Sequence, residues 1–324
     1  MPIYTHRLVE EADFPRVAEL MNQVDREPTS VDDLLNWARN AYALQQDRVY
    51  TRIVCFNEDG VMVGFAHVIR WSWMPPGQLW ARVVVDPVHQ RRGAGTYLYE
   101  RAIEIARSQN STRIMSDVKE DCPACLRFAE QRGFRVEHHT FESRLDLATF
   151  DEARFAGVIE AVEASGIRFF TLAELGDTEE ARRHLYEINM RFSQDNPGRA
   201  GHSTMTYEEF TGRVFNSRWF RSDGQIIAAD TTDPNDGDKW VGLAAVGYYP
   251  KSNSMHNAFT GVDRAYRGRH IALALKLQAI RVARAYHATS IRTDNDSENA
   301  PMLAINRKLG YQQEPGIYEM LKNL

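Results

Sequence analysis

The sequence predicts an α/β protein with two tandem domains, each a mixed, twisted sheet flanked by helices. The first observation is a strand–turn–helix unit. The β-branched run Val83–Val85 indicates a buried strand, Asp86-Pro87 ends it, and apolar residues recur at helical spacing from about Gly93. The second observation is that residues 260–283 repeat this unit. The third is the length of 324 residues, which suits two domains of roughly 100–200 residues each.

The repeat has a constant offset. Asp86 and Asp263, which follow the two strands, lie 177 residues apart. The same offset joins the pairs Gln90 and Arg267, Gly95 and Ala272, Leu98 and Leu275, Ala106 and Ala283, Leu126 and Leu303, and Gly133 and Gly310. Because a solenoid repeat is only about 20–50 residues long, this offset indicates a duplicated domain.

Hydrophobic periodicity and turn residues place the elements of the first copy. Asp13 is predicted to cap a helix that contains Val17–Met21, and Glu58-Asp59-Gly60 is predicted to be the turn of a hairpin. The expected strands are 3–8, 52–56, 61–73, 79–85, 114–118 and 134–147, and the further expected helices are 31–43, one from about 93, and 123–131.

The same signals place the elements of the second copy after an acidic helical connector at 151–164. The expected strands are 167–172, 218–229, 239–249, 256–262, 291–293 and 317–321, and the expected helices are 178–190, 206–214, one after the second turn, and 300–309. The polar segment 193–203 has no counterpart in the first copy, and is interpreted either as a lid or acceptor loop or as an insertion without a role. Residues 230–238 are predicted to form a solvated loop.

Both turns have the features of an anion site. A strand that turns into a helix leaves backbone N–H groups exposed at the positive end of the helix dipole. Gly93 and Gly95 let the backbone approach an anion closely. Four arginines add positive charge at the two turns: Arg91, Arg92, Arg267 and Arg269. Since the formal net charge of the chain is −5, a basic surface for nucleic acid is excluded, and a small phosphorylated ligand is expected.

The two turns resemble the acyl-CoA pyrophosphate loop of the GNAT acyltransferases. That loop reads Gln or Arg, two residues, Gly, one residue, then Gly or Ala. Here it is matched by Gln90-x-x-Gly93-x-Gly95 and by Arg267-x-x-His270-x-Ala272. The last strand–helix–strand unit of the family resembles the segment with Asn295, Asn299, Pro301-Met302, Asn306 and Leu309-Gly310-Tyr311. The two copies cover nearly the whole chain, so the sequence is similar to tandem, two-domain members of the family.

The resemblance implies that acetyl-CoA is the cosubstrate and that each copy carries residues able to bind it. The implied binding residues of the second copy are Val262, Arg267, Gly268, Arg269, His270, Ile271, Ala272, Asn295, Asn299 and Met302. Those of the first copy are Val85, Gln90, Arg91, Arg92, Gly93, Ala94 and Gly95. The implied oxyanion donor is a backbone N–H on the strand before each loop, around Val83–Val85 and Gly261–Val262.

The resemblance also implies direct attack of an amine on the thioester, which requires a proton acceptor and a proton donor. The position of the family's tyrosine acid is occupied here by Asn306, which cannot supply this proton. Tyr266 is the first candidate to replace it as the proton donor. Further substitutes are Tyr248, Tyr249, Tyr311 or water. No carboxylate lies within 239–262, so His256 is the candidate base, since its unperturbed pKa is about 6.5. The alternative is an ordinary polar histidine at a strand end.

The second copy is expected to be the catalytic one. It has Asn299 and Met302 where the first copy has Cys122 and Cys125, so the first copy is interpreted as a CoA-binding or scaffolding relic. The expected domains are an N-terminal one at 1–148, a helical connector at 149–165 and a C-terminal one at 166–324, packed as a pseudo-dimer.

The predicted function is an acetyl-CoA-dependent N-acyltransferase that acts on a small-molecule amine, as a monomer or homodimer. The alternatives are a non-catalytic acyl-CoA sensor, which the missing tyrosine favours, and an enzyme for a longer acyl-CoA.

Further observations limit the location and the ligands. The Cys122-Pro-Ala-Cys125 motif admits a redox or zinc interpretation, but no second cysteine pair completes a zinc site, and no metal is expected. No apolar run approaches about 20 residues, so no membrane partner is expected. The charged start predicts that no secretory signal is present. Three cysteines cannot form a disulfide framework, which predicts a cytoplasmic protein.

Overall fold

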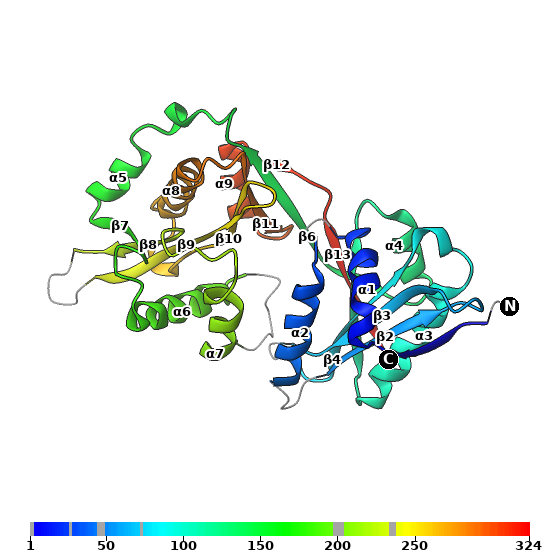
Figure 1. The fold of residues 1–324 in the computed structure, drawn as a ribbon. Coiled ribbons are helices and arrows are strands. Elements are labelled where there is room, and N and C mark those ends of the chain that lie inside the picture. Colours follow the sequence, from blue (N-terminus) through cyan, green and yellow to red (C-terminus); the bar gives the residue numbers. More distant parts are fainter. Residues whose placement is uncertain (1–2, 26–27, 44–48, 72–73, 197–203, 233–237) are drawn as a thin grey trace. The chain divides into compact units, whose positions relative to one another are not determined.

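The computed structural model describes residues 3–25, 28–71 except 44–48, 74–196, 204–232 and 238–324. These residues form two compact units (Figure 1). Unit 1 comprises Met1–Val118, Cys122–Glu137 and Tyr318–Leu324, and unit 2 comprises Lys119–Asp121 and His138–Ile317. The predicted α/β class with two tandem domains is confirmed.

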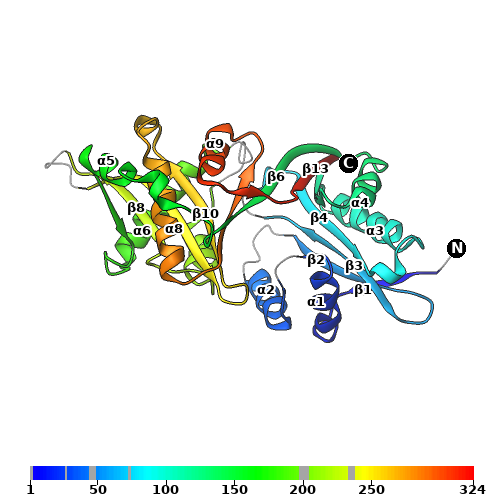
Figure 2. The same cartoon turned by 90° about the horizontal axis from the view of Figure 1, so that it is seen from above.

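Unit 1 has a mixed sheet with the strand order β1-β2-β3-β4-β5-β13. Its elements are β1 (Thr5–Leu8), α1 (Phe14–Asn22), α2 (Val31–Ala43), β2 (Tyr50–Phe56), β3 (Met62–Ile69), β4 (Gln78–Val85), α3 (Ala94–Ser108), β5 (Arg113–Lys119), α4 (Pro123–Glu130) and β13 (Ile317–Asn323). Helices α3 and α4 cover one face of the sheet and α1 and α2 cover the other, and a separate apolar cluster lies under each pair (Figure 2).

Unit 2 repeats this arrangement with the strand order β7-β8-β9-β10-β11-β6. Its elements are β6 (Arg135–Asp146), α5 (Val158–Ala164), β7 (Ile167–Thr171), α6 (Glu179–Ser193), α7 (Tyr207–Phe210), β8 (Gln225–Asp230), β9 (Lys239–Tyr249), β10 (Ser254–Val262), α8 (Ile271–Ala285), β11 (Ser290–Asp296), α9 (Ala300–Leu309) and β12 (Gln312–Gln313). Helices α8 and α5 lie on one face of the sheet, and α6 and α7 lie on the other.

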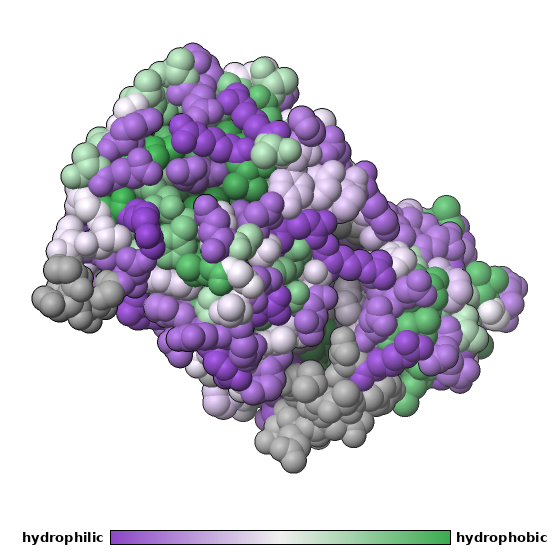
Figure 3. Space-filling model, turned by 60° about the vertical axis from the view of Figure 1, so that its left-hand side comes forward, coloured by the Kyte–Doolittle hydropathy of each residue, from purple (hydrophilic) through white to green (hydrophobic). Residues whose placement is uncertain are grey.

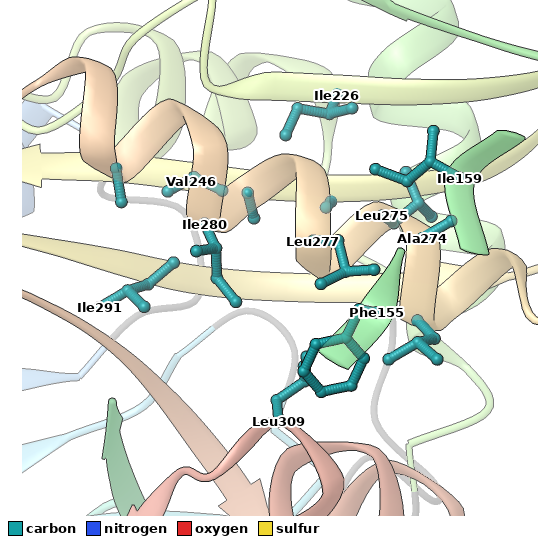
Figure 4. Packing of buried hydrophobic residues seen from close by; sticks show 14 of the residues in the cluster. Phe155, Ile159, Ile226, Val246, Ala274, Leu275, Leu277, Ile280, Ile291 and Leu309 are labelled. Carbon is teal, nitrogen blue, oxygen red and sulfur yellow. The ribbon is translucent and has the colours of Figure 1, made fainter. Parts of the chain in front are cut away.

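Helix α8 is the centre of the larger core of unit 2. Figure 4 shows Leu275, Leu277 and Ile280 of this helix among strand residues such as Val246 and Ile291. All five side chains are at most 2% exposed. A helix that is apolar on most of its surface must be buried on most of it, so α8 has little freedom to move relative to the sheet. The face of the molecule drawn in Figure 3 is mainly hydrophilic, with apolar residues interspersed.

The last strands of the two copies differ from the sequence prediction. Strand β6, expected to end the first domain, pairs antiparallel with β11 of unit 2 from Ser290–Asp146 to Asp296–Thr140. Strand β13, expected to close the second domain, belongs to unit 1. There Met320 is fully buried in the core under α3. Each copy therefore contributes its final strand to the other unit, an exchange that no local sequence signal reveals.

Two smaller differences have local causes. The expected strand 218–229 is β-structure only over Gln225–Asp230. The expected connector helix is broken into a 3-10 turn (Glu152–Phe155) and α5, because Gly157 adopts a φ of 80°. A positive φ is accessible to glycine at little cost and interrupts the helical backbone.

The sulfurs of Cys122 and Cys125 form a disulfide at the start of α4, and Cys55 is a buried free thiol. The expectation that the cysteines form no disulfide framework is thus modified by one local bond. Among the described residues, no helix is long and apolar enough to cross a membrane.

Candidate active site

The two anion turns have the same backbone and side-chain geometry. Arg267 Nε donates to Val262 O at 3.2 Å, and Gln90 Nε2 donates to Val85 O at 3.1 Å. The side chain of the first residue of each motif thus forms a hydrogen bond with the last residue of the preceding strand. The sequence match at an offset of 177 residues is therefore a match in structure.

Both turns enter the following helix through left-handed residues. In unit 2 these are Gly268 with a φ of 80° and His270 with a φ of 61°. His270 is the N-cap of α8, and the first bond within the helix runs from Ala274 N to His270 O at 3.0 Å. The preceding N–H groups of the first turn, including those of Ile271 and Ala272, have no acceptor within the helix. Backbone donors at the positive end of a long helix suit a phosphate group.

The arginines at this turn have protein partners. Arg264 Nε donates to Asp195 Oδ1 at 2.8 Å, and Arg267 Nη2 pairs with Asp195 Oδ2. The hydrogen bond from Arg264 and the charge of Arg267 hold the pKa of Asp195 below its usual value, although burial opposes the shift. Arg269 Nη2 donates to Ser165 O at 3.2 Å. An incoming anion would therefore compete with Asp195 for Arg267, a partner that the sequence pattern did not indicate.

A pocket of about 610 Å³ lies in unit 2 between this turn and the point where two strands separate. The parallel pairing of β10 with β11 runs from Ser254–Ser290 to His256–Arg292 and then stops. Beyond that point, residues 258–262 of β10 and 293–296 of β11 line the pocket, together with the first turn of α8 and the start of α9. The opening between the strands is thus part of the pocket wall.

A β-bulge starts this separation. The register of β10 against β9 shifts between Asn257 and Phe259. The buried Asn257 side chain stabilises the bulge, because its Nδ2 donates to Ala245 O at 3.2 Å and to Phe259 O at 2.7 Å. Its Oδ1 accepts from Thr260 Oγ1 at 3.0 Å and from Lys276 Nζ at 2.9 Å. A bulge re-aims the strand and leaves part of its edge unpaired, which is common beside active sites.

Lys276 was missed by the sequence interpretation. It lies on α8 among apolar neighbours, lines the pocket and is 1% exposed. Burial lowers the pKa of its amine from 10.5 to about 7. One signal was available in the sequence, because a lysine between Leu275 and Leu277 interrupts an otherwise apolar helix.

His256 lies where the pairing of β10 with β11 ends. Its Nε2 is 3.1 Å from Asp294 Oδ2, an ion-pair distance, without the angle of a hydrogen bond. Burial would raise the pKa of Asp294, but His256 and Arg292 hold it below its usual value. Asp294 lines the pocket and His256 does not. Met255 is buried under α8, so alternation along the strand directs His256 to the opposite face of the sheet.

Two of the predicted site residues, Asn295 and Asn306, form a buried hydrogen-bond network. Asn306 Nδ2 donates to Asn295 Oδ1 at 2.6 Å, and Asn295 Nδ2 donates to Ser143 Oγ at 2.9 Å. Asn295 lines the pocket, whereas Asn306 is 2% exposed and is absent from its wall. Asn299 caps α9, with its Oδ1 accepting from Met302 N at 3.3 Å, and both of these residues line the pocket.

Tyr266 also reaches the pocket, at the turn rather than at the bulge. Its hydroxyl donates to Asp230 Oδ2 at 2.7 Å. This bond raises the pKa of Tyr266, and hydrogen bonds from Thr232 and Tyr266 lower the pKa of Asp230 to about 2. The hydroxyl is therefore occupied at the end of the pocket where the phosphates are expected.

The remaining predictions concern a metal site and two loops. Within the described part of the chain, no group of histidine, cysteine, aspartate or glutamate side chains could hold a metal ion. The predicted loops 193–203 and 230–238 fall largely on 197–203 and 233–237, which lie outside the described residues.

Comparison with known proteins gives concordant results. Residues 14–134 and 183–311 match the model of the acetyltransferase (GNAT) family. A mycothiol acetyltransferase from Saccharomonospora viridis is 26% identical to the chain in an alignment of 281 residues, and the match covers 80% of each protein.

Two solved structures have the same fold over almost the whole chain. A GCN5-related N-acetyltransferase from Sphaerobacter thermophilus has a TM-score of 0.71 and 19% identity, with 99% of this chain and 95% of that chain covered. A tandem GNAT protein from the clavulanic acid biosynthesis pathway has a TM-score of 0.72 and 19% identity, with 99% and 98% covered.

Proposed function

From the premise that the chain belongs to the acetyltransferase (GNAT) family, we propose that unit 2 transfers an acetyl group from acetyl-CoA to the nitrogen of a small-molecule amine. The single observation that carries this proposal is the pocket between β10 and β11. It begins at the unpaired amides of α8 and ends where a bulge opens the sheet. One end suits a diphosphate and the other suits a reacting carbonyl.

In this proposal, the pyrophosphate of acetyl-CoA binds the amides of residues 268–272 and the side chain of Arg267. The pantetheine arm follows the pocket past Asn299 and Met302 toward the bulge. Since β11 has separated from β10 there, amides of β10 around Gly261–Val262 can donate to the carbonyl oxygen. Preorganised backbone donors stabilise the oxyanion of the tetrahedral intermediate without reorganisation.

His256 is the proposed base, with Asp294 as the carboxylate that stabilises its charged form. The amine nitrogen attacks the thioester carbonyl carbon, and His256 takes the proton that this nitrogen loses. The C–S bond then breaks, and the thiolate of CoA takes up a proton. The position of His256 on the face opposite α8 supports entry of the amine from that face, while acetyl-CoA enters along α8. Two substrates on opposite sides of one opening fit direct transfer without a covalent enzyme intermediate.

The second candidate function is that of an acyl-CoA-binding sensor without turnover. The observation that favours it is Asn306, which occupies the position of the family's tyrosine acid and is buried in a hydrogen-bond network. The two functions agree on binding and differ in the release of free thiol.

The test places a glutamate at the same position of each of the two turns. We expect Arg267→Glu to raise the KM for acetyl-CoA about 30–100-fold, because it replaces a cation at the proposed phosphate site with an anion. Gln90→Glu, at the same position in unit 1, should change it less than twofold. The measurement is the rate of thiol release with a panel of small amines, with calorimetry to measure acetyl-CoA binding.

Each outcome has a distinct meaning. If acetyl-CoA binds, Arg267→Glu weakens this binding and no amine gives turnover, the result would support the sensor function. An unchanged KM for Arg267→Glu and a raised one for Gln90→Glu would place the working site in unit 1. The absence of any acetyl-CoA binding would contradict the proposal itself.

A further inference from the structure

We propose that Lys276 donates the proton that the departing CoA thiolate takes up in unit 2. The inference rests on the proposed function, and it supplies the acid that the family pattern lacks at Asn306. It is argued from the position of Lys276 in the pocket, from its surroundings and from the charge that develops in the reaction.

Lys276 stands at the reacting end of the pocket. It lies six residues beyond the N-cap His270, which is about 9 Å along the helix from the phosphate turn. Its Nζ donates to Asn257 Oδ1 at 2.9 Å, and Asn257 is the residue at which the bulge of β10 begins. The amine is therefore fixed beside the opening between β10 and β11, where the thioester of the proposed complex must lie for an amine to reach it.

The surroundings of Lys276 leave its charge uncompensated. Its ammonium lies 5.3 Å from the centroid of the Tyr311 ring, which provides a weak cation–π contact. It bonds the neutral side chain of Asn257 on β10, and the neutral side chains of Thr293 and Asn295 on β11 line the same pocket. Across the described residues, burial is the cause of its lowered pKa, with no carboxylate contributing. Asp294 and Asp296 also line the pocket, two residues apart on the strand, on the face of β11 that carries the His256 pair.

An uncompensated buried cation is stabilised by an anion that forms next to it. The sulfur of CoA is neutral in the thioester and becomes negative as the C–S bond breaks. The attraction to Lys276 therefore grows between ground state and transition state, which is the condition for catalysis. A buried amine with a pKa of about 7 is also a strong enough acid to protonate a thiolate, whose ordinary pKa is about 8.5.

The proton balance of the step closes. On collapse of the tetrahedral intermediate, the electron pair of the C–S bond goes to sulfur, and a proton moves from Lys276 Nζ to that sulfur. The products on this side are CoA thiol and neutral Lys276. His256 holds the proton lost by the attacking nitrogen, and Lys276 regains a proton from water after CoA leaves. No covalent bond to Lys276 forms at any stage.

The decisive experiment uses bound CoA without acetyl group or amine. In the full-length protein saturated with CoA, the ultraviolet absorbance of the thiolate is followed against pH. We expect the wild type to hold the bound thiol's apparent pKa at least one unit below that found with Lys276→Met, because the ammonium stabilises the thiolate. Lys308→Met, which removes an exposed lysine from the wall of the same pocket, should leave the wild-type titration unchanged.

A second variant separates charge from proton transfer. Lys276→Arg keeps a cation that does not release its proton at these pH values, so it should retain part of the thiolate stabilisation but lose turnover. Both variants are expected to lower kcat about 100-fold, with a KM for acetyl-CoA within threefold of the wild type. Thermal unfolding would show that each variant is folded.

Three results would overturn this proposal. If the thiol titrates at the same pH in the wild type and in Lys276→Met, Lys276 does not act on the sulfur of CoA. This result would overturn the inference even if CoA binds well and the proposed function stands. A kcat for Lys276→Arg equal to that of the wild type would exclude proton donation. Failure of CoA to bind the wild type would instead overturn the proposed function, and this inference with it.

Discussion

Units 1 and 2 have the same fold and the same turn geometry, but they differ in what fills the space beside the turn. In unit 1, Arg132 joins α4 to α3, because its Nη2 donates to Thr96 Oγ1 at 2.7 Å and its guanidinium lies 3.5 Å from the Phe128 ring centroid. In unit 2 the corresponding elements border the open pocket. Duplication has preserved the backbone of the turn, while the side chains beside the turn differ between the two units.

The strands next to the turn differ in a second respect. Strand β4 pairs with β3 in one continuous register, and its parallel pairing with β5 ends at Trp80–Met115. Trp80 Nε1 donates to Asp117 Oδ2 at 2.8 Å, at the position that His256 and Asp294 occupy in unit 2. The titratable imidazole of unit 2 is thus matched by a neutral indole in unit 1. This contrast explains why we place the chemistry in unit 2.

The helix after the turn shows a third contrast. The position of Lys276 in α8 is that of Tyr99 in α3, whose hydroxyl accepts from Lys322 Nζ at 2.6 Å. Tyr99 is half-buried, whereas Lys276 is almost fully buried. A buried lysine without a carboxylate lowers the stability of a protein, so its presence in only one unit points to use rather than to packing.

The largest expected effect tests this third contrast. At pH 7, Lys276→Met should raise the free energy of unfolding by up to about 5 kcal/mol. The reason is that each unit of pKa shift corresponds to about 1.36 kcal/mol, and the pKa falls from 10.5 to about 7. The native state binds this proton more weakly than the unfolded chain, so wild-type stability rises with pH between about 7 and 10.5. The difference in the free energy of unfolding between Lys276→Met and the wild type, measured by urea unfolding, should therefore shrink over that pH range.

The control for this prediction is Tyr99→Phe, which removes a polar group at the matching position of unit 1. The difference in the free energy of unfolding between Tyr99→Phe and the wild type should stay constant between pH 7 and 9. A gap between Lys276→Met and the wild type that does not change with pH would mean that Lys276 keeps an ordinary affinity for its proton.

The next effect concerns catalysis. His256→Ala should lower kcat about 100- to 1000-fold, equivalent to about 3–4 kcal/mol, because it removes the proposed base. Asp294→Asn should lower it less, about 10-fold, since the imidazole remains. The matched variants Trp80→Phe and Asp117→Asn in unit 1 should change kcat less than twofold. Equal losses in both units would contradict the assignment of the chemistry to unit 2.

The smallest effect concerns the disulfide of unit 1. Exchange of both Cys122 and Cys125 for serine should lower the free energy of unfolding by about 2 kcal/mol or less, because the bond closes a loop with a sequence separation of only 3. The kcat should be unchanged, since the bond lies outside the proposed site. Dithiothreitol should lower the free energy of unfolding of the wild type by the same amount and leave that of the variant unchanged. A loss of turnover would give unit 1 a direct role.

The sequence by itself determined the elements that depend on local periodicity and turn chemistry. It predicted α2, β9 and α9 with the bounds that the structure shows, and it placed a strand–helix turn before each of α3 and α8. These features could be predicted because strand patterns, helix patterns and glycine-containing turns are set by neighbours in the chain. The duplication was also visible, because it is a relation within the sequence.

Only the tertiary structure decided the exchange of β6 and β13, the bulge at Asn257 and the meeting of His256 with Asp294. Each of these joins segments that are distant in sequence or depends on which strand lies beside which. Lys276 shows the same limit, because a lysine in a helix is ordinary until its burial is known. Local pattern fixes the elements, and the environment that gives a side chain its chemistry exists only when those elements pack together.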